Sequence, residues 1–390
     1  MIMKLMAGVF RLVASVLQLA PLKRRVVLMS RQSDKPSLDF KVLKAQLERD
    51  YPDVEVSMCL SQPELSSKAA FVFGTLRQLK EASCTQVVVV DGYVPAVCIP
   101  KKRSGATVLQ MWHALGAIKK FGYQSVDTAS GRSSQDARAA HMHENYDEIV
   151  AGGCESVPVF AEAFGYDASS IKPLGLPRID YLVEQDPQGA RAKKMAVIRK
   201  GNPVFDNGKT TILYAPTLRK GEGYADWLSQ AVESLAQCCD GDKFNFVVTA
   251  HPLNNHVDSA VLVRNPHVTL IEGGSTIDLL GLADCVITDY SAVALEAGIL
   301  GNPVFFYVPD IDVYRVSPGL NIDPLECFPQ VSSVDASALM EAITQAADSP
   351  EGLACDGTFS AMIEHDFGAV MDGCCCQRIA AEIVQMLDRS

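Results

Sequence analysis

The chain has 390 residues, 48% of them hydrophobic and 21% charged, which fits two globular domains and does not fit a disordered protein. Its formal net charge is −11, yet residues 1–25 hold five cations and no acid, so subtracting those cations leaves −16 for the remainder. This distribution argues against nucleic acid as the main partner and indicates an anionic surface that only the N-terminal segment approaches.

The first predicted element is an amphipathic helix at residues 1–22. Its small or polar residues recur at steps of four and three, while the other positions are apolar. Because cations interrupt the apolar run, it is shorter than the roughly 20 residues that span a bilayer, and no signal-peptide cleavage pattern follows. We therefore predict a helix in the headgroup plane of an anionic membrane; the alternative is a helix packed on the protein itself or on a second subunit. The polar stripe consists of Lys4, Gly8, Arg11, Ser15 and Gln18.

Residues 23–182 are predicted to form the first domain, because short apolar runs alternate there with amphipathic stretches. The runs lack a strict polar and apolar alternation, which is typical of parallel strands buried on both faces. Strands are predicted at 25–30, 54–60, 85–93 and 106–113, helices at 36–51 and 64–82, and the segments 147–153 and 171–182 close this half.

A polar, turn-rich segment at 183–208 is the predicted linker, and the same alternation resumes over 209–370. Residues 371–390 contain a predicted closing helix. Two successive units of this kind indicate an α/β fold with two Rossmann-like domains that face each other across a cleft. The apolar runs of the second domain are 210–217, 244–252, 268–273, 285–290 and 303–308.

Two histidines lie at predicted strand ends, where ligands of open α/β sheets collect. His113 ends a strand of the first domain and His251 ends one of the second, so two imidazoles that titrate near neutrality are predicted to face each other across the cleft. For each histidine, the alternative is a hydrogen-bonded structural role. Lys119 is a candidate ligand for an anionic acceptor; its alternative is a solvated side chain on a helix face.

Residues 285–298 combine a strand, a turn and a helix, the arrangement in which free main-chain N–H groups meet an anion. Ser291 is predicted to cap this helix and to donate its hydroxyl to a phosphate; the alternative is a plain helix cap. Arg219 provides a fork that can clamp a diphosphate together with Thr217. One turn into the helix, Glu296 either reaches ribose hydroxyls or only complements the helix dipole.

The sequence carries no strong metal, redox or nicotinamide signature. Its twelve cysteines are scattered without a CxxC pair, which disfavours a zinc site and indicates a reducing cytoplasm. A GxGxxG motif and a P-loop are absent. Asp310 and Asp312 have the DxD spacing of some metal sites, but this spacing is common on loops. We therefore predict neither a metal nor a cofactor.

Four motifs follow one another along the chain: WHALGAIKKFGY at 112–123, YAPTLR at 214–219, HPLNNH at 251–256 and ITDYSAVALEAGILGNPVFFYVPDIDVY at 287–314. In these motifs and their order the chain resembles the CDP-glycerol glycerophosphotransferase family, which builds teichoic acids in Gram-positive bacteria. The resemblance implies a GT-B fold and peripheral attachment to the cytoplasmic face of the cell membrane. It also implies transfer of glycerol phosphate, or a related polyol phosphate, from CDP-glycerol to a hydroxyl of an undecaprenyl-diphosphate-linked glycan, with release of CMP.

The resemblance also assigns roles to individual positions. Its Trp-His motif falls on Trp112 and His113, with the histidine as general base for the acceptor hydroxyl. Its His-Pro motif falls on His251, which would assist at the diphosphate. The motif that would cradle the nucleotide falls on Asp289, Tyr290 and Ser291.

Two departures from the family pattern favour members that add a single primer unit. Many polymerising members read Gly-Thr-Pro where this chain has Ala114, Leu115 and Gly116, and the usual second serine is Ala292. The long additional N-terminal region of some polymerases is also missing from this sequence. The alternatives are a GT-B glycosyltransferase or epimerase that uses a UDP-sugar, and a scaffold that retains the fold without catalysis.

Overall fold

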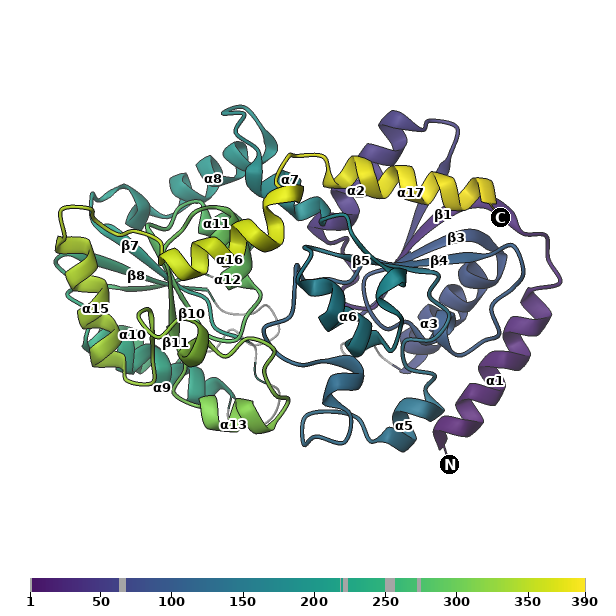
Figure 1. Cartoon of the computed structure of the whole chain (residues 1–390), viewed down its shortest axis with the longest axis horizontal. Coiled ribbons are helices and arrows are strands. Elements are labelled where there is room, and N and C mark those ends of the chain that lie inside the picture. Colours follow the sequence, from purple (N-terminus) through teal and green to yellow (C-terminus); the bar gives the residue numbers. More distant parts are fainter. Residues whose placement is uncertain are drawn as a thin grey trace. The chain divides into compact units, whose positions relative to one another are not determined.

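The computed structural model divides the chain into two compact α/β units (Figure 1). The first unit comprises Met1–Asp180 and Ala369–Ser390, and the second comprises Tyr181–Gly368. Helix α7, Pro177–Val183, contains the boundary between them. The residues that the structure describes are 2–62, 68–217, 219, 224–249, 257–271 and 275–389.

The first unit is built on a parallel six-stranded sheet with the order β2-β1-β3-β4-β5-β6. All six residues of β3 are buried, because helices cover both faces of the sheet, and this explains the continuous apolar run in the sequence. The predicted parallel strands of this half are confirmed. Their bounds are β1 Lys23–Ser30, β2 Glu55–Leu60, β3 Thr85–Val90, β4 Thr107–Gln110, β5 Glu148–Ala151 and β6 Ile171–Pro173.

The C-terminal helix α17, Cys375–Arg389, belongs to the first unit although the second unit precedes it in the chain. Asp180 anchors its start, because its carboxylate accepts the main-chain N–H groups of Cys375 and Cys376 at 2.9 and 2.7 Å. The other helices of this unit are α1 Ile2–Leu17, α2 Leu38–Asp50, α3 Lys68–Cys84, α4 Pro95–Cys98, α5 Ser134–Ala139 and α6 Ser156–Phe164.

Helix α1 presents one apolar face to the protein and another to solvent. Ala7 and Ala14 are buried against the first unit, where α1 contacts α3. Val9, Leu12 and Val16 are 51%, 68% and 61% exposed. The helix is thus packed on its own unit, as the alternative prediction held, and still exposes an apolar stripe. Within the described part of the chain, no helix has the length and the apolar character needed to cross a membrane.

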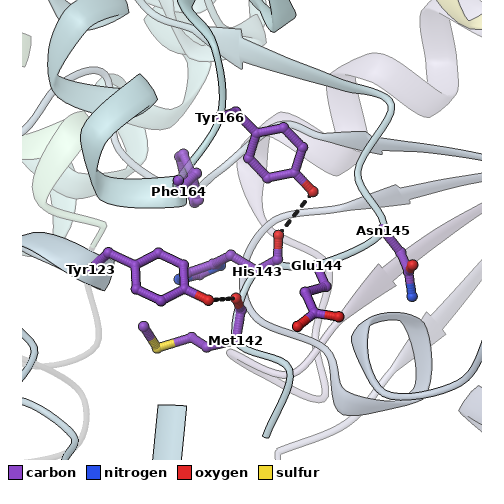
Figure 2. Close-up of a pocket in the computed structure, with 8 residues that line it drawn as sticks. Tyr123, Met142, His143, Glu144, Asn145, Phe164 and Tyr166 are labelled. Atoms are coloured by element: carbon purple, nitrogen blue, oxygen red, sulfur yellow. Dashed lines mark hydrogen bonds between the residues drawn. The ribbon is translucent and has the colours of Figure 1, made fainter. Parts of the chain in front are cut away.

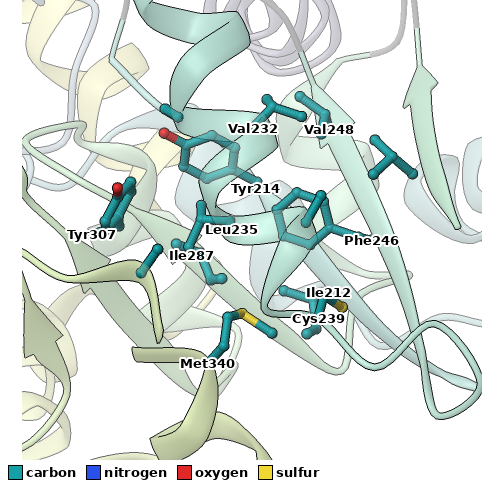
Figure 3. Packing of buried hydrophobic residues seen from close by; sticks show 14 of the residues in the cluster. Ile212, Tyr214, Val232, Leu235, Cys239, Phe246, Val248, Ile287, Tyr307 and Met340 are labelled. Carbon is teal, nitrogen blue, oxygen red and sulfur yellow. The ribbon is translucent and has the colours of Figure 1, made fainter. Parts of the chain in front are cut away.

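The second unit repeats the architecture with the strand order β12-β11-β10-β7-β8-β9, and every neighbouring pair is parallel. Figure 3 shows the core on one side of this sheet, where Tyr214, Phe246 and Ile287 pack with side chains of the covering helices. The strands are β7 Thr210–Tyr214, β8 Phe244–Thr249, β9 Val268–Ile271, β10 Cys285–Thr288, β11 Val304–Tyr307 and β12 Ser332–Ser333.

The segment 183–208, which we predicted as a linker, is part of the second unit. It forms α8, Ala190–Gly201, and α8 contacts α11. The helices of this unit are α8, α9 Tyr224–Gln237, α10 Ser259–Arg264, α11 Thr276–Leu280, α12 Val293–Ile299, α13 Ile311–Val316, α14 Pro324–Cys327, α15 Ala336–Asp348 and α16 Gly357–Phe367.

Each sheet has a point at which the strand order reverses, and ligands of such sheets bind there. In the second unit this point lies between β7 and β10, which pair side by side. The chain segments that leave these strands begin at Ala215 and Asp289. The fold therefore brings two of the sequence motifs to one edge of one sheet.

Candidate active site

His113 lies in the loop after β4, and its ring is hydrogen-bonded to the end of β3. Its Nδ1 is 2.9 Å from the main-chain oxygen of Asp91. Because a carbonyl oxygen can only accept, Nδ1 must carry the hydrogen, and Nε2 then keeps its lone pair. Desolvation by the surrounding protein lowers the pKa of His113, although the exposure of the side chain to water weakens this effect. Both features suit a neutral imidazole.

Gln110 holds the turn that presents His113. Its side chain is fully buried, its Nε2 donates to the oxygen of Gly92 at 3.1 Å, and its Oε1 accepts the N–H of Trp112 at 2.8 Å. Trp112 has a φ of 58°, in the left-handed region that a bulky residue rarely adopts. The Gln110 amide thus stabilises an unfavourable backbone angle directly before the histidine.

The Trp112 ring packs beside His113. Its centroid is 4.2 Å from that of His113 and 4.7 Å from that of Phe121, on which it stacks. Lys119 follows in the same loop and is half-buried there, and its positive charge also contributes to lowering the pKa of His113. Lys119 therefore lies on a loop and not on the solvated helix face that was its alternative prediction.

Asp91 is a buried carboxyl group next to this site. It is 3% exposed, and its Oδ1 has no hydrogen-bond partner among the residues that the structure describes. Burial raises the pKa of Asp91 to about 7, and the nearby carboxylate of Asp39 acts in the same direction. Asp91 therefore titrates near neutral pH.

In the second unit, Asp289 joins the segments that follow β7 and β10. Its side chain is completely buried. Its Oδ1 accepts the N–H groups of Thr217 at 2.8 Å and of Tyr290 at 2.6 Å, and its Oδ2 accepts from Arg219 at 2.9 Å. One carboxylate thus fixes both loops at the edge where a ligand would bind.

Arg219 is directed at carboxylates in this structure, whereas we expected its fork to clamp a diphosphate. Its Nε and Nη2 donate to the two oxygens of Asp310 at 2.8 and 3.0 Å, and the guanidinium carbon lies 3.2 Å from the ring centroid of Trp227. Burial opposes its charge, but the carboxylates of Asp289 and Asp310 outweigh burial and raise the pKa of Arg219. The pairing with Asp310 also gives the DxD segment a structural role.

The hydroxyl of Thr217 is buried, and its Oγ1 lacks a partner within the described part of the chain. An unpaired buried hydroxyl is rare, because leaving it without a hydrogen bond costs free energy. Its position at the end of β7, where ligands of such sheets bind, makes it a candidate donor to a ligand.

The helix after β10 begins differently from our prediction. The N-cap of α12 is Ala292, because Val293 is its first residue, and Ser291 instead accepts the N–H of Val293 at a long 3.4 Å. Tyr290 is buried, donates its hydroxyl to Asp310 at 3.1 Å and stacks on a neighbouring tyrosine ring. Glu296 is buried in the first turn of α12.

The structure thus brings Thr217, Arg219, Asp289, Tyr290 and Ser291 together at one sheet edge and places Trp112, His113 and Lys119 in one loop of the other unit. His251 and the rest of the segment 251–256 lie outside the described residues.

Sequence reasoning did not identify Gln110 or Trp227 as parts of these sites, and it considered Asp310 only for its DxD spacing. The sequence does contain a sign of the role of Gln110, because it is the single polar residue in the apolar run VLQM at the end of a predicted strand. Trp227 had none, because an aromatic residue on an amphipathic helix is usually only a core residue.

The chain was compared with known proteins. A family model described as CDP-Glycerol:Poly(glycerophosphate) glycerophosphotransferase matches residues 12–385. The teichoic acid ribitol-phosphate primase of Bacillus spizizenii is 30% identical over 322 residues, which cover 80% of each chain. The teichoic acid glycerol-phosphate primase of Bacillus subtilis is 26% identical over 259 residues, covering 66% of this chain and 65% of the relative.

Solved structures with the same fold include the wall teichoic acid polymerase TagF, with a TM-score of 0.72 and 20% identity over 97% of this chain and 94% of that chain. A UDP-GlcNAc 2-epimerase from Neisseria meningitidis matches with a TM-score of 0.60 and 15% identity over 93% of this chain and 100% of that chain. At these identities the likeness shows the fold alone, which is GT-B-like.

Proposed function

Because the chain belongs to the CDP-glycerol:poly(glycerophosphate) glycerophosphotransferase family, we propose that it transfers glycerol phosphate, or a related polyol phosphate, from a CDP-polyol to a lipid-linked teichoic acid precursor. The acceptor is a hydroxyl of an undecaprenyl-diphosphate-linked glycan, and CMP is released. The observation that carries this proposal is the hydrogen bond from His113 to the oxygen of Asp91, because it leaves Nε2 unprotonated and ready to accept a proton.

In the proposed reaction, the acceptor hydroxyl oxygen attacks the β-phosphorus of the CDP-polyol in line with the leaving group. The new O–P bond forms as the bond between that phosphorus and the CMP oxygen breaks. His113 Nε2 takes the proton of the attacking hydroxyl. Lys119 is assigned to the negative charge of the acceptor, and Trp112 to holding the imidazole against rotation.

We assign donor binding to the second unit. The buried Thr217 hydroxyl supports this assignment, because a phosphate oxygen would supply the partner that it lacks among the described residues. Asp289, Tyr290 and Arg219 then act by holding the two loops in place, and Ser291 contributes a hydroxyl at the start of α12. Glu296 is assigned to the ribose, and His251 to the diphosphate.

We further propose that the chain adds one unit and works at the cytoplasmic face of the cell membrane as a peripheral protein. The sequence Ala114-Leu115-Gly116 after His113, and Ala292 after the Asp-Tyr-Ser motif, support the first point. The exposed apolar stripe of α1, next to cations such as Lys23 and Arg24, supports the second.

The test is CMP release from CDP-glycerol and CDP-ribitol, each with a lipid-linked disaccharide acceptor and with the same acceptor already carrying one glycerol phosphate. Release that requires the unmodified acceptor supports a primase, and the active donor identifies the polyol. Release only with the primed acceptor would indicate an enzyme that acts after the primase. No release with any pair, together with turnover of a UDP-sugar, would establish the GT-B alternative.

A further inference from the structure

The first unit contains a cavity of about 470 Å³ that the proposed chemistry does not use (Figure 2). This volume is in the range of small-molecule sites. We call it the tyrosine pocket. It is lined by Tyr123, Met142, His143, Glu144, Asn145, Phe164, Gly165 and Tyr166.

The loop that forms one wall of the tyrosine pocket has an unusual backbone. His141, His143 and Asn145 have φ angles of 49°, 60° and 75°, in the left-handed region. Such an angle is sterically unfavourable for a residue with a Cβ atom, because the Cβ approaches the following carbonyl oxygen. Strain of this kind persists where the surroundings hold the chain in place, and it is concentrated at functional sites.

Side chains from outside the loop hold it in this shape. Tyr123 donates its hydroxyl to the oxygen of Met142 at 2.6 Å, and Tyr166 donates to the oxygen of His143 at 2.9 Å, as the dashed lines in Figure 2 show. The amide of Asn145 donates to main-chain oxygens of the segment 97–100 at 2.9–3.1 Å. The wall of the tyrosine pocket is therefore formed before any ligand binds.

The lining has the chemistry of a site for a neutral polyhydroxyl ligand. Among the described residues that line it there is no lysine or arginine, and burial keeps His143 neutral by lowering its pKa to about 3. Both phenol hydrogens are already donated to carbonyls, and the Tyr166 oxygen accepts the N–H of Tyr146 at 2.9 Å, so the Tyr123 oxygen is the phenol acceptor left for a ligand. The carboxylate of Glu144, half exposed, is a further acceptor. Hydroxyl groups can donate to these oxygens, whereas a phosphate would be repelled by Glu144.

Aromatic rings add a second feature of sugar recognition. Tyr123 is 36% exposed, and its ring and those of Phe164 and Tyr166 line the pocket. The C–H groups on one face of a pyranose pack well against an aromatic side chain, because the face of the aromatic ring carries partial negative charge and the C–H hydrogens carry partial positive charge. Aromatic faces combined with oxygen acceptors therefore indicate a carbohydrate.

The surroundings of the tyrosine pocket connect it to the proposed reaction. His143 and Phe164 contact the indole of Trp112, with centroids 6.1 and 5.2 Å away, and His113 contacts the same indole, with a centroid distance of 4.2 Å. At the other end of the loop, His141 is hydrogen-bonded to Arg11 of α1. The loop that lines the pocket thus contacts α1 through His141, and the pocket residues contact the indole that packs beside the proposed general base.

We propose that the tyrosine pocket binds a pyranose ring of the acceptor glycan. This inference rests on the proposed function, since it takes the acceptor to be a lipid-linked glycan. The lipid end would extend toward α1, and the reacting hydroxyl would extend past Trp112 to His113.

The test compares Tyr123→Ala, which removes the ring, with Tyr123→Phe, which keeps its aromatic face. Glu144→Gln is a second probe that removes only the charge. The first readout is acceptor-dependent CMP release. We expect Tyr123→Ala to raise the acceptor KM at least tenfold, with the donor KM within twofold of the unaltered chain. Tyr123→Phe loses the phenol acceptor and the bond to Met142 but keeps the ring, so it should raise the acceptor KM by a smaller factor and leave the donor KM within twofold. An unchanged acceptor KM in both Tyr123→Ala and Glu144→Gln would overturn the inference, as would a selective rise in the donor KM.

The second readout does not depend on turnover. Saturation-transfer NMR with the free disaccharide of the acceptor should show contacts to its C–H protons in the unaltered chain and in Tyr123→Phe, and none in Tyr123→Ala. If no CDP-polyol is turned over, the proposed function fails, but a disaccharide signal that requires the Tyr123 ring still supports a sugar site. Absence of any disaccharide signal in the unaltered chain, or a signal from CMP that Tyr123→Ala removes, would overturn the inference whether or not transfer occurs.

Discussion

The ring of His113 and the main-chain oxygen of Asp91 are joined by a hydrogen bond of 2.9 Å. This bond fixes which ring nitrogen carries the proton and leaves Nε2 as the basic atom. It also ties the loop after β4 to the end of β3, so the position of the imidazole depends on two adjacent strands of the sheet.

Replacement of His113 should remove the proposed general base. We expect His113→Ala and His113→Gln to lower kcat for CMP release by about 10²- to 10⁴-fold, with little change in thermal stability. In the unaltered chain the rate should fall on acidification, because protonation of Nε2 abolishes its basicity. Since the pKa of His113 is lowered, this fall should occur at a pH below the ordinary histidine pKa of about 6.5. Retention of the rate within a few-fold in both variants would remove His113 from the mechanism.

Gln110 should act on the rate through the position of His113. Gln110→Leu has a similar shape but leaves the N–H of Trp112 and the oxygen of Gly92 without their partner, each at a cost of about 1–3 kcal/mol where buried. We expect a lower unfolding temperature and a kcat reduced at least tenfold, with unchanged KM values. Gln110→Glu, which keeps the acceptor for Trp112, should recover part of the rate. A destabilised Gln110→Leu chain with normal kcat would restrict this residue to folding.

Replacement of Thr217 should weaken donor binding without lowering the stability of the chain. Its hydroxyl has no hydrogen-bond partner in the described part of the structure, so the nearly isosteric Thr217→Val should leave the unfolding temperature unchanged or raise it. The donor KM should rise by about tenfold or more, since a hydrogen bond to a charged phosphate contributes about 1.5–3 kcal/mol. Thr217→Ser, which retains the hydroxyl, is the matched control. A normal donor KM in Thr217→Val would contradict the assignment.

His143 should make the stability of the first unit sensitive to acid. Its pKa is lowered to about 3 by burial, while the unfolded chain titrates near 6.5, so the unfolded state binds more protons between these values. Stability is therefore lost as the pH falls below 6.5, by about 1.4 kcal/mol per pH unit. His143→Asn, which tolerates the positive φ, should lose about 2 kcal/mol less than the unaltered chain between pH 7.5 and 5.0 in denaturant titrations.

Asp91 changes the stability of the first unit with pH in the direction opposite to His143. Its pKa is raised to about 7, so the folded state binds the additional proton between about 3.8 and 7, and this contribution to stability is lost as the pH rises. It is present in both chains and cancels when they are compared. Equal pH dependence of the unaltered and His143→Asn chains would contradict the prediction.

The exposed stripe of α1 should bind membranes. We expect Leu12→Glu combined with Val16→Glu to reduce co-sedimentation with anionic vesicles several-fold, because both side chains are exposed and their replacement disturbs no core contact. Val197→Glu combined with Val263→Glu makes the same kind of change on exposed residues of α8 and α10. Equal sedimentation of the two double variants would refute the membrane role of α1.

Some features of this protein follow from the sequence alone. Apolar runs without alternation predict parallel strands, because strands covered on both faces have no polar side, and both sheets confirm this. The periodicity at the N-terminus predicts a helix, which α1 is. Since strand ends are readable from the same pattern, Thr217 and His113 could be selected as site candidates from their positions.

Other features depend on contacts between distant segments, which no local pattern encodes. The sequence indicated that Arg219 follows a strand, but only the folded chain brings Asp310 to it and turns the guanidinium toward that carboxylate. Likewise, the hydrogen-bonding geometry between β3 and β4 decides the tautomer of His113. The tyrosine pocket arises because the packing of α6 beside the loop 140–146 decides which rings face the cavity. Side-chain direction and pairing are properties of tertiary packing, whereas strand and helix periods are properties of the local chain.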